Sequence, residues 1–207
     1  MYTELPIPKN FDPANAGNWS YRPDENALMT SASEWAKKHS IRASATDKFL
    51  IHLLVIDAQK DFCFPEGTLY VGGRSGTGAI DDNRRLAEFM YRNLGVISKT
   101  SMTMDTHFPF QIFSPVFWTN EKGEPLSAHS MISFDGNVLV NTDPAGKVLN
   151  VNVRPSLAMA EWLCGGNYPW LVNQTKFYVR ELERAGKYVL YLWPMHCILG
   201  TDGHALA

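Results

Sequence analysis

The sequence predicts an α/β fold with a mostly parallel sheet and flanking helices. Three short apolar runs, at residues 49–57, 96–104 and 188–193, are separated by segments with helical periodicity or turn residues. A continuous run of branched apolar residues is typical of a strand buried on both faces, as in a parallel sheet. Strands that alternate with helices in this way favour parallel pairing with the helices on the faces.

Helical periodicity supplies the covering elements. A helix is expected from about Ile80, and two more are expected at residues 156–163 and 170–185, where Gly186 ends the last. The intervening loop at residues 65–78 is rich in glycine but lacks the Lys-Ser/Thr of a phosphate-binding loop, so no phosphate site is predicted there. The first expected helix presents an apolar face made of Leu86, Phe89, Met90 and Leu94.

Two segments fall outside this alternation. Residues 1–48 are rich in Pro and Asn, with one possible helix at 27–39, and are expected to form an arm that packs on the domain or on a partner subunit. The domain itself is expected to span residues 49–207, with an insert at about 119–153. Within the insert, residues 138–140 and 148–153 are expected to pair as a hairpin. Long excursions of this kind are often functional or oligomeric, so a homo-oligomer is expected.

Composition excludes several classes of partner. The net charge of −2 and the scattered basic residues give no reason to expect a nucleic acid or an anionic membrane. The three cysteines show no paired spacing, which favours a reducing compartment. The start of the chain lacks a signal-peptide profile, and no apolar run is long enough for a bilayer. A cytoplasmic protein is therefore expected.

Polar residues stand where each predicted strand ends: Asp57 after the first, Asp105 and His107 after the second, and His196 with Cys197 after the third. Ligands of parallel sheets bind beyond the carboxyl ends of the strands. If the three strands are neighbours, these side chains meet at one edge of the sheet. The sequence therefore predicts a functional site at that edge.

These residue types suit acid–base and metal chemistry. Asp57 closes an apolar strand, where a scarcity of water suits a general base or acid, although it could equally cap the next turn. Asp105 and His107 are two residues apart, so an extended chain puts both side chains on one face, and His196 can supply a third metal ligand. The alternative is two ordinary polar residues at a turn and a structurally satisfied histidine.

The cysteines offer no convincing nucleophile. Cys197 is adjacent to His196, and neighbouring residues on a strand face opposite ways, so a packed thiol is expected. Cys63 could be partly exposed in a loop, and Cys164 is expected at a helix end. Neither has a base beside it in the sequence.

Three segments together resemble the nicotinamidase/isochorismatase-like cysteine hydrolases. They are Val55-Ile-Asp57-Ala-Gln-Lys-Asp61-Phe62 with the following Gly67-Thr-Leu-Tyr-Val71, then Met104-Asp105-Thr-His107, and then Trp193-Pro-Met-His196-Cys197-Ile-Leu-Gly200-Thr201-Asp-Gly203. The third is long and specific. The resemblance covers residues 49–207, with an enlarged region at 119–187, and does not cover residues 1–48.

The resemblance implies the isochorismatase-like hydrolase fold in partial form and a hydrolase that opens the C–N bond of a small ring carboxamide through a thioester. Asp57 matches the family's acid–base aspartate. Asp105, His107 and His196 match ligands of a divalent zinc, iron or manganese ion that orients the substrate in nicotinamidases. Phe113 stands where many nicotinamidases have a further histidine, so a three-residue site, or no metal, is compatible with the pattern.

The family's catalytic Lys and nucleophilic Cys follow the third segment, where only residues 198–207 remain, so the chain is expected to be partial. Two alternatives stay open. One is a metal-free isochorismatase-like hydrolase in which Asp105 and His107 bind the substrate. The other is a non-catalytic member that uses residues 119–153 and 1–48 for binding or assembly.

Overall fold

The computed structural model describes residues 4–186 and 188–207 and divides the chain into two compact units. The first consists of residues 1–106 and 200–207, and the second of residues 107–199. The division does not test the predicted boundary between an arm and a domain at residue 48. Among the described residues, no helix is long and apolar enough to cross a membrane.

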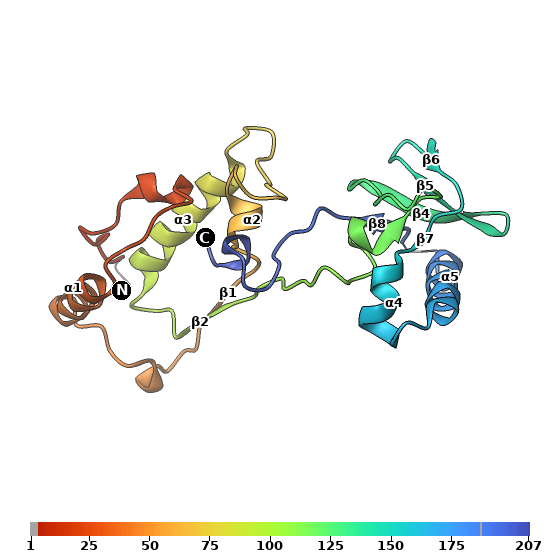
Figure 1. Ribbon diagram of the computed structural model, residues 1–207. Coiled ribbons are helices and arrows are strands. Elements are labelled where there is room, and N and C mark those ends of the chain that lie inside the picture. The colour runs from red at the N-terminus through yellow and green to blue at the C-terminus, as the bar shows by residue number, and fades with distance from the viewer. Residues whose placement is uncertain (1–3, 187) are drawn as a thin grey trace. The chain divides into compact units, whose positions relative to one another are not determined.

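The first unit combines helices with one pair of strands (Figure 1). The longest helix of this unit, α3, begins with Gly78 and so confirms the helix expected near Ile80. Helix α1 begins after Asp24, whose side chain accepts a hydrogen bond from the Ala27 N–H and so caps the helix. The elements of this unit are η1 (Pro13–Gly17), α1 (Glu25–Lys38), η2 (Ser44–Thr46), β1 (His52–Val55), α2 (Lys60–Cys63), α3 (Gly78–Asn93), β2 (Lys99–Met102) and η4 (Asp202–His204).

The segment before β1 packs on α3. The Leu5 N–H donates a hydrogen bond to the Arg92 carbonyl at 2.9 Å, and the rings of Phe11 and Tyr91 meet edge to face with centroids 5.6 Å apart. The expected arm therefore contacts α3.

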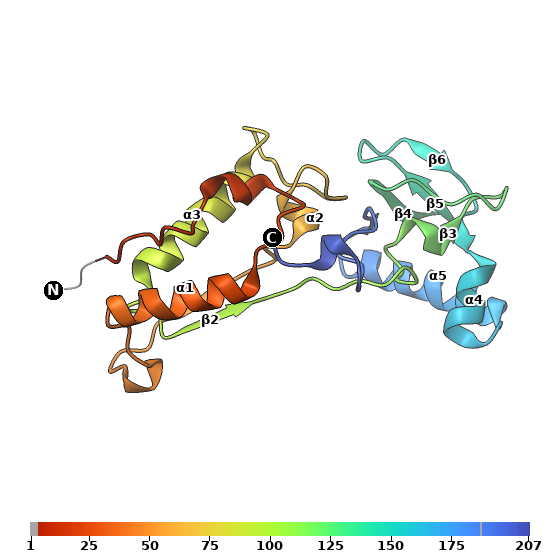
Figure 2. The ribbon, with the colours of Figure 1, turned by 60° about the vertical axis from the view of Figure 1, so that its left-hand side comes forward.

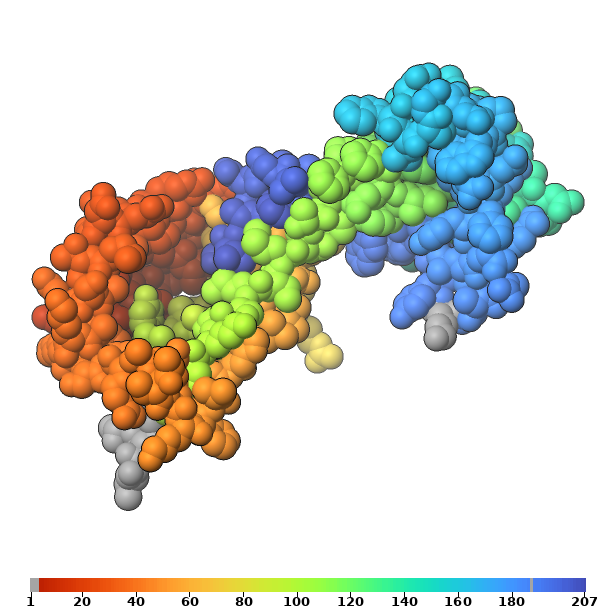
Figure 3. All heavy atoms as spheres, turned by 90° about the horizontal axis from the view of Figure 1, so that it is seen from below, coloured from red at the N-terminus to blue at the C-terminus, as the bar shows by residue number. Residues whose placement is uncertain are grey.

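Strands β1 and β2 pair in parallel, with His52 opposite Lys99 and Val55 opposite Met102. Figure 3 shows the two segments side by side, β1 in orange and β2 in yellow-green. The predicted burial of the first run on both faces is wrong, because Phe49 is 80% exposed and Ile56 is 68% exposed. Within the described residues this sheet contains only two strands, so β1 is an edge strand and not the central strand of a larger sheet.

The second unit is built on an antiparallel sheet in the order β6-β5-β4-β8, with a short antiparallel pair of β3 and β7 (Figure 1). The pairing of β5 with β6 confirms the expected hairpin. The elements are η3 (Pro115–Phe117), β3 (Trp118–Thr119), β4 (Ser130–Asp135), β5 (Val138–Thr142), β6 (Val148–Asn150), β7 (Arg154–Pro155), α4 (Leu157–Cys164), α5 (Tyr168–Arg184) and β8 (Leu190–Leu192).

A hydrophobic core holds the second unit together. Helix α5 packs against β4 (Figure 2). It buries Leu171, Thr175 and Val179, which are spaced by one helical turn and so lie on one face. Trp118 and Ile132 are fully buried in the same cluster. Every buried residue of this cluster belongs to the second unit. The predicted insert is therefore a large part of a folded core.

The predicted mostly parallel sheet is wrong. The third apolar run forms β8, which pairs antiparallel with β4, with Leu192 opposite Ser130 and Leu190 opposite Ile132. Leu190 and Leu192 are 5% and 0% exposed, so this pairing buries the apolar side chains of the run within the second unit. An apolar run indicates that a strand is buried but says nothing about its direction or its partner. The fold is therefore mixed α/β, with one parallel pair and short antiparallel sheets.

Candidate metal centre

Asp57 follows β1 and is tied to the end of β2. Its N–H donates to Thr103 Oγ1 at 3.1 Å, and its Oδ1 accepts a hydrogen bond from the same hydroxyl at 2.6 Å. Asp57 is half-buried, has a φ of 52°, and lines a cavity of about 410 Å³ together with Cys63 and Asn83. A positive φ is unusual for a residue other than glycine, and it is a feature that recurs at functional sites.

Gln59 fixes the backbone of Asp105. Its side chain is fully buried, with Oε1 accepting the Asp105 N–H at 2.7 Å and Nε2 donating to the Asp105 carbonyl at 2.9 Å. Nε2 also donates to the His204 carbonyl at 2.8 Å. The amide thus satisfies both backbone groups of Asp105. Gln59 belongs to the first of the three segments quoted above, but no role was predicted for it. Its position, two residues after the aspartate that ends the first predicted strand, is the only sequence feature that could have indicated one.

His107 lies beside the segment that follows His196. The His107 N–H donates to the Cys197 carbonyl at 3.0 Å, and the Leu199 N–H donates to the His107 carbonyl at 3.1 Å. His107 and Ile198 form a parallel bridge. These bonds bring the rings of His107 and His196 to a centroid separation of 4.8 Å. The two histidines meet through backbone pairing in a loop, and not at the ends of neighbouring strands as expected.

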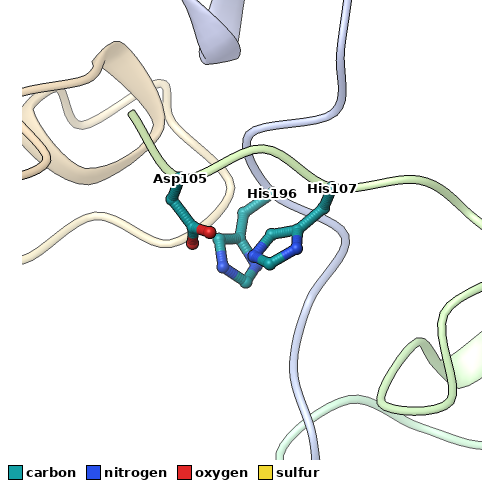
Figure 4. Close-up of side chains that lie close together, drawn as sticks. All are labelled: Asp105, His107 and His196. Atoms are coloured by element: carbon teal, nitrogen blue, oxygen red, sulfur yellow. The ribbon is translucent and has the colours of Figure 1, made fainter. Parts of the chain in front are cut away.

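The structure brings together the three residues that the sequence singled out as metal ligands. Asp105, His107 and His196 each offer a ligand atom, and these atoms lie within 4.8 Å of one another (Figure 4). Two are half-buried and His196 is buried. Ligand atoms of a tetrahedral zinc site are about 3.3 Å apart, given metal–ligand distances of about 2.0 Å. The spread of up to 4.8 Å is therefore wider than the spacing of ligand atoms around a bound zinc ion.

Hydrogen bonds indicate which nitrogen of each histidine carries the proton in the neutral form. His196 Nδ1 lies 2.6 Å from the Pro194 carbonyl, which can only accept, so Nδ1 carries the proton. His107 Nδ1 lies 2.9 Å from Gln111 Oε1. In the neutral form both rings then have their lone pair on Nε2, one of the two nitrogens through which a neutral imidazole binds a metal.

The set of donors suits a borderline divalent metal. Two imidazoles and one carboxylate are the nitrogen and oxygen ligands that zinc, iron and manganese accept, and three protein ligands leave positions for water or substrate. Phe113, at the position where many nicotinamidases have a histidine, meets the His107 ring edge to face with centroids 4.8 Å apart. It offers no ligand atom.

The cysteines are free thiols outside this group. Cys197 is fully buried, in agreement with a packed thiol. The expected partial exposure of Cys63 is wrong, because it is 7% exposed and burial raises the pKa of its thiol. Cys164 ends α4 as predicted, and its Sγ lies 3.2 Å from the Ala160 carbonyl. A buried thiol with a raised pKa is a poor nucleophile.

The remaining histidines make ordinary side-chain contacts. His52 Nε2 lies 2.9 Å from Ser101 Oγ, and His204 Nε2 lies 2.9 Å from Thr106 Oγ1. His129 Nδ1 lies 3.2 Å from the hydroxyl of Tyr191.

No family model, no curated protein and no solved structure matches the chain. The resemblance to cysteine hydrolases therefore depends on the three segments quoted above and remains a prediction.

Proposed function

We propose that this chain binds a divalent transition metal through Asp105, His107 and His196, and that the centre serves a nicotinamidase-type hydrolysis of a small ring carboxamide. The observation that carries the proposal is the convergence of the three ligand atoms within 4.8 Å. It is supported by the two histidine Nδ1 atoms, each of which faces an oxygen acceptor. Both lone pairs are thereby directed to Nε2.

Asp57 is the proposed acid–base residue. Its carboxylate accepts a hydrogen bond from the Thr103 hydroxyl and lines a cavity, which none of the three proposed metal ligands lines. A carboxylate that lines a cavity can exchange a proton with a molecule bound there. In the proposed reaction Asp57 takes the proton of an attacking thiol and gives it to the amide nitrogen, so that the carbon–sulfur bond forms, the C–N bond breaks and ammonia leaves. Water then hydrolyses the thioester, which releases the acid and restores the thiol. A bound divalent metal supplies a Lewis-acidic position that orients the substrate. Cys63 and Cys197 are buried, and the Cys164 thiol donates to the Ala160 carbonyl, so the proposed reaction requires a thiol that these three cysteines do not supply.

Aromatic residues next to His107 favour a planar substrate. The rings of Phe108 and Phe110 stack with centroids 5.4 Å apart, and Phe110 stacks on Trp162 at 6.0 Å. Trp162 is 75% exposed, so the stack ends in an accessible ring face. Flat aromatic ligands stack favourably on such faces.

The test is amide hydrolysis by the protein in the form that includes the attacking thiol, with nicotinamide as the substrate and ammonia release as the readout. We expect turnover that is lost on treatment with a chelator and restored by zinc, iron or manganese. Turnover that is indifferent to the chelator would favour the metal-free hydrolase. The absence of both turnover and bound metal would contradict the proposal.

Assembly is the second candidate function. Large apolar side chains are exposed before and along β1, including Phe49 at 80% and Leu50 at 76%. Exposed apolar patches of this kind mark interaction surfaces. Light scattering coupled to size-exclusion chromatography tests this candidate, because a concentration-independent monomer would argue against it and against a homo-oligomer.

A further inference from the structure

Gln111 makes two hydrogen bonds through one atom. Its Oε1 lies 2.9 Å from His107 Nδ1 and accepts the Phe108 N–H at 3.0 Å. Gln111 stands four residues after His107 in the segment before η3, and the Gln111 N–H donates to the Phe108 carbonyl at 3.2 Å. The turn at residues 108–111 thus folds the amide back onto the ring of a candidate metal ligand.

The hydrogen bond from the Phe108 N–H identifies which atom of the Gln111 amide faces His107. A backbone N–H can only donate, so the atom facing Phe108 must be the amide oxygen and not the amide nitrogen. The same oxygen can only accept from His107, so the proton of the neutral imidazole lies on Nδ1. The lone pair is then on Nε2, the nitrogen that a metal would bind.

We propose that Gln111 is a positioning residue, which holds His107 in the Nδ1–H tautomer and fixes its ring orientation for a divalent metal. This inference rests on the proposed function, since it concerns the same site. His196 has an equivalent partner in the Pro194 carbonyl, which no side-chain substitution removes. Gln111 is a side chain, so its contribution can be measured. Partners of metal-bound histidines typically contribute about 10- to 100-fold to metal affinity.

The competing explanation is that Gln111 only closes its own turn. Two substitutions distinguish this structural role from the positioning of His107. Gln111→Met keeps the length of the side chain but removes the acceptor, whereas Gln111→Glu retains an oxygen that can accept both hydrogen bonds and strengthens the bond to the imidazole. Gln174→Met is the matched control, because Gln174 is exposed on α5.

The first measurement is the affinity for zinc by competition with a chromophoric chelator. We expect Gln111→Met to weaken binding about 10- to 100-fold, and Gln111→Glu to bind zinc at least as tightly as the unchanged protein. Gln174→Met should match the unchanged protein. Affinity of Gln111→Met within twofold of the unchanged protein would overturn the proposal, as would equal losses in the Met and Glu variants.

The second measurement needs no metal. In the metal-free protein at about pH 8, where an ordinary imidazole is neutral, ¹⁵N-detected ring correlations report which nitrogen carries the proton. We expect His107 to be protonated on Nδ1 in the unchanged protein and in Gln111→Glu, and to populate the other tautomer in Gln111→Met. An unchanged tautomer in Gln111→Met would refute the role of Gln111. Failure of the unchanged protein to bind zinc, with the tautomer result as expected, would instead count against the proposed function.

Discussion

The hydroxyl of Thr103 donates a hydrogen bond to Asp57 Oδ1 at 2.6 Å and accepts one from the Asp57 N–H at 3.1 Å. Thr103 comes directly after β2 and Asp57 two residues after β1, so this pair of bonds joins the ends of two parallel strands. It also fixes the orientation of a carboxylate at a backbone position with positive φ. The aspartate is therefore held in place before any substrate binds.

Asp57→Asn should abolish nicotinamide hydrolysis in the protein that carries out turnover, with little loss of fold. The amide keeps the shape of the carboxylate but cannot take a proton, and loss of a general base costs about 10²- to 10⁴-fold. Steady-state kinetics and a thermal melt measure the two effects. Asp82→Asn is the control, because exposed Asp82 lines the same cavity. Retained activity in Asp57→Asn would mean that the base is assigned wrongly.

Gly203→Ala should destabilise the protein by about 1–3 kcal/mol in the free energy of unfolding. A Cβ at Gly203 would overlap the buried Asp61 carboxylate, which accepts the Thr68 N–H at 3.0 Å. Gly95→Ala is a matched control, because its Cβ would meet only Leu5 Cδ1 at 3.7 Å. Urea unfolding compares the two variants, and equal stabilities would contradict this account of the packing around Asp61.

Leu192→Ala should cost about 2–5 kcal/mol, the usual range for a truncated core leucine. Leu192 is fully buried in β8 against the antiparallel partner β4, so its loss leaves a cavity in the core of the second unit. Leu157→Ala on α4 should cost far less, because Leu157 is 70% exposed. Chemical denaturation measures both. A small effect of Leu192→Ala would place β8 outside the core.

Cys63 should make stability depend on alkaline pH. Burial raises the pKa of its thiol above the ordinary value of 9.0. A raised pKa means that the folded state favours the neutral thiol. This contribution is fully present below pH 9.0 and is lost as the pH rises through the higher folded value. Urea unfolding from about pH 8 to pH 11 should show a decline in stability that is shallower in Cys63→Ala. Identical pH profiles for the two proteins would contradict the assignment.

Local sequence patterns predicted where helices and strands form better than they predicted which strands pair. The periodicity of Leu86 and Phe89 indicated α3, and the pairing of β1 with β2 followed from two nearby apolar runs. The partner of β8 was not predictable in this way. Leu190 and Leu192 pack with Ile132 of β4. That choice depends on contacts between residues about 60 positions apart, which a short apolar run does not encode.

The candidate site shows the same division. Asp105 and His107 are two residues apart, so their proximity follows from an extended chain. His196 was expected to join them at the end of a neighbouring strand. It joins them instead through the hydrogen bond between the His107 N–H and the Cys197 carbonyl, which the sequence did not predict. Gln59 and Gln111 were missed because a single amide has no periodicity. Their roles depend on a backbone N–H that only the folded chain presents.

The stoichiometry and affinity of metal binding test the central claim most directly. Isothermal titration of the metal-free protein with zinc should show one tight site in the unchanged protein. His107→Ala and His196→Ala should each lose it, because each removes one of three ligands. His129→Ala should leave binding unchanged, since His129 contacts Tyr191 and is outside the group. Absence of tight binding in the unchanged protein, or retention of the site in both ligand variants, would contradict the assignment of this metal centre.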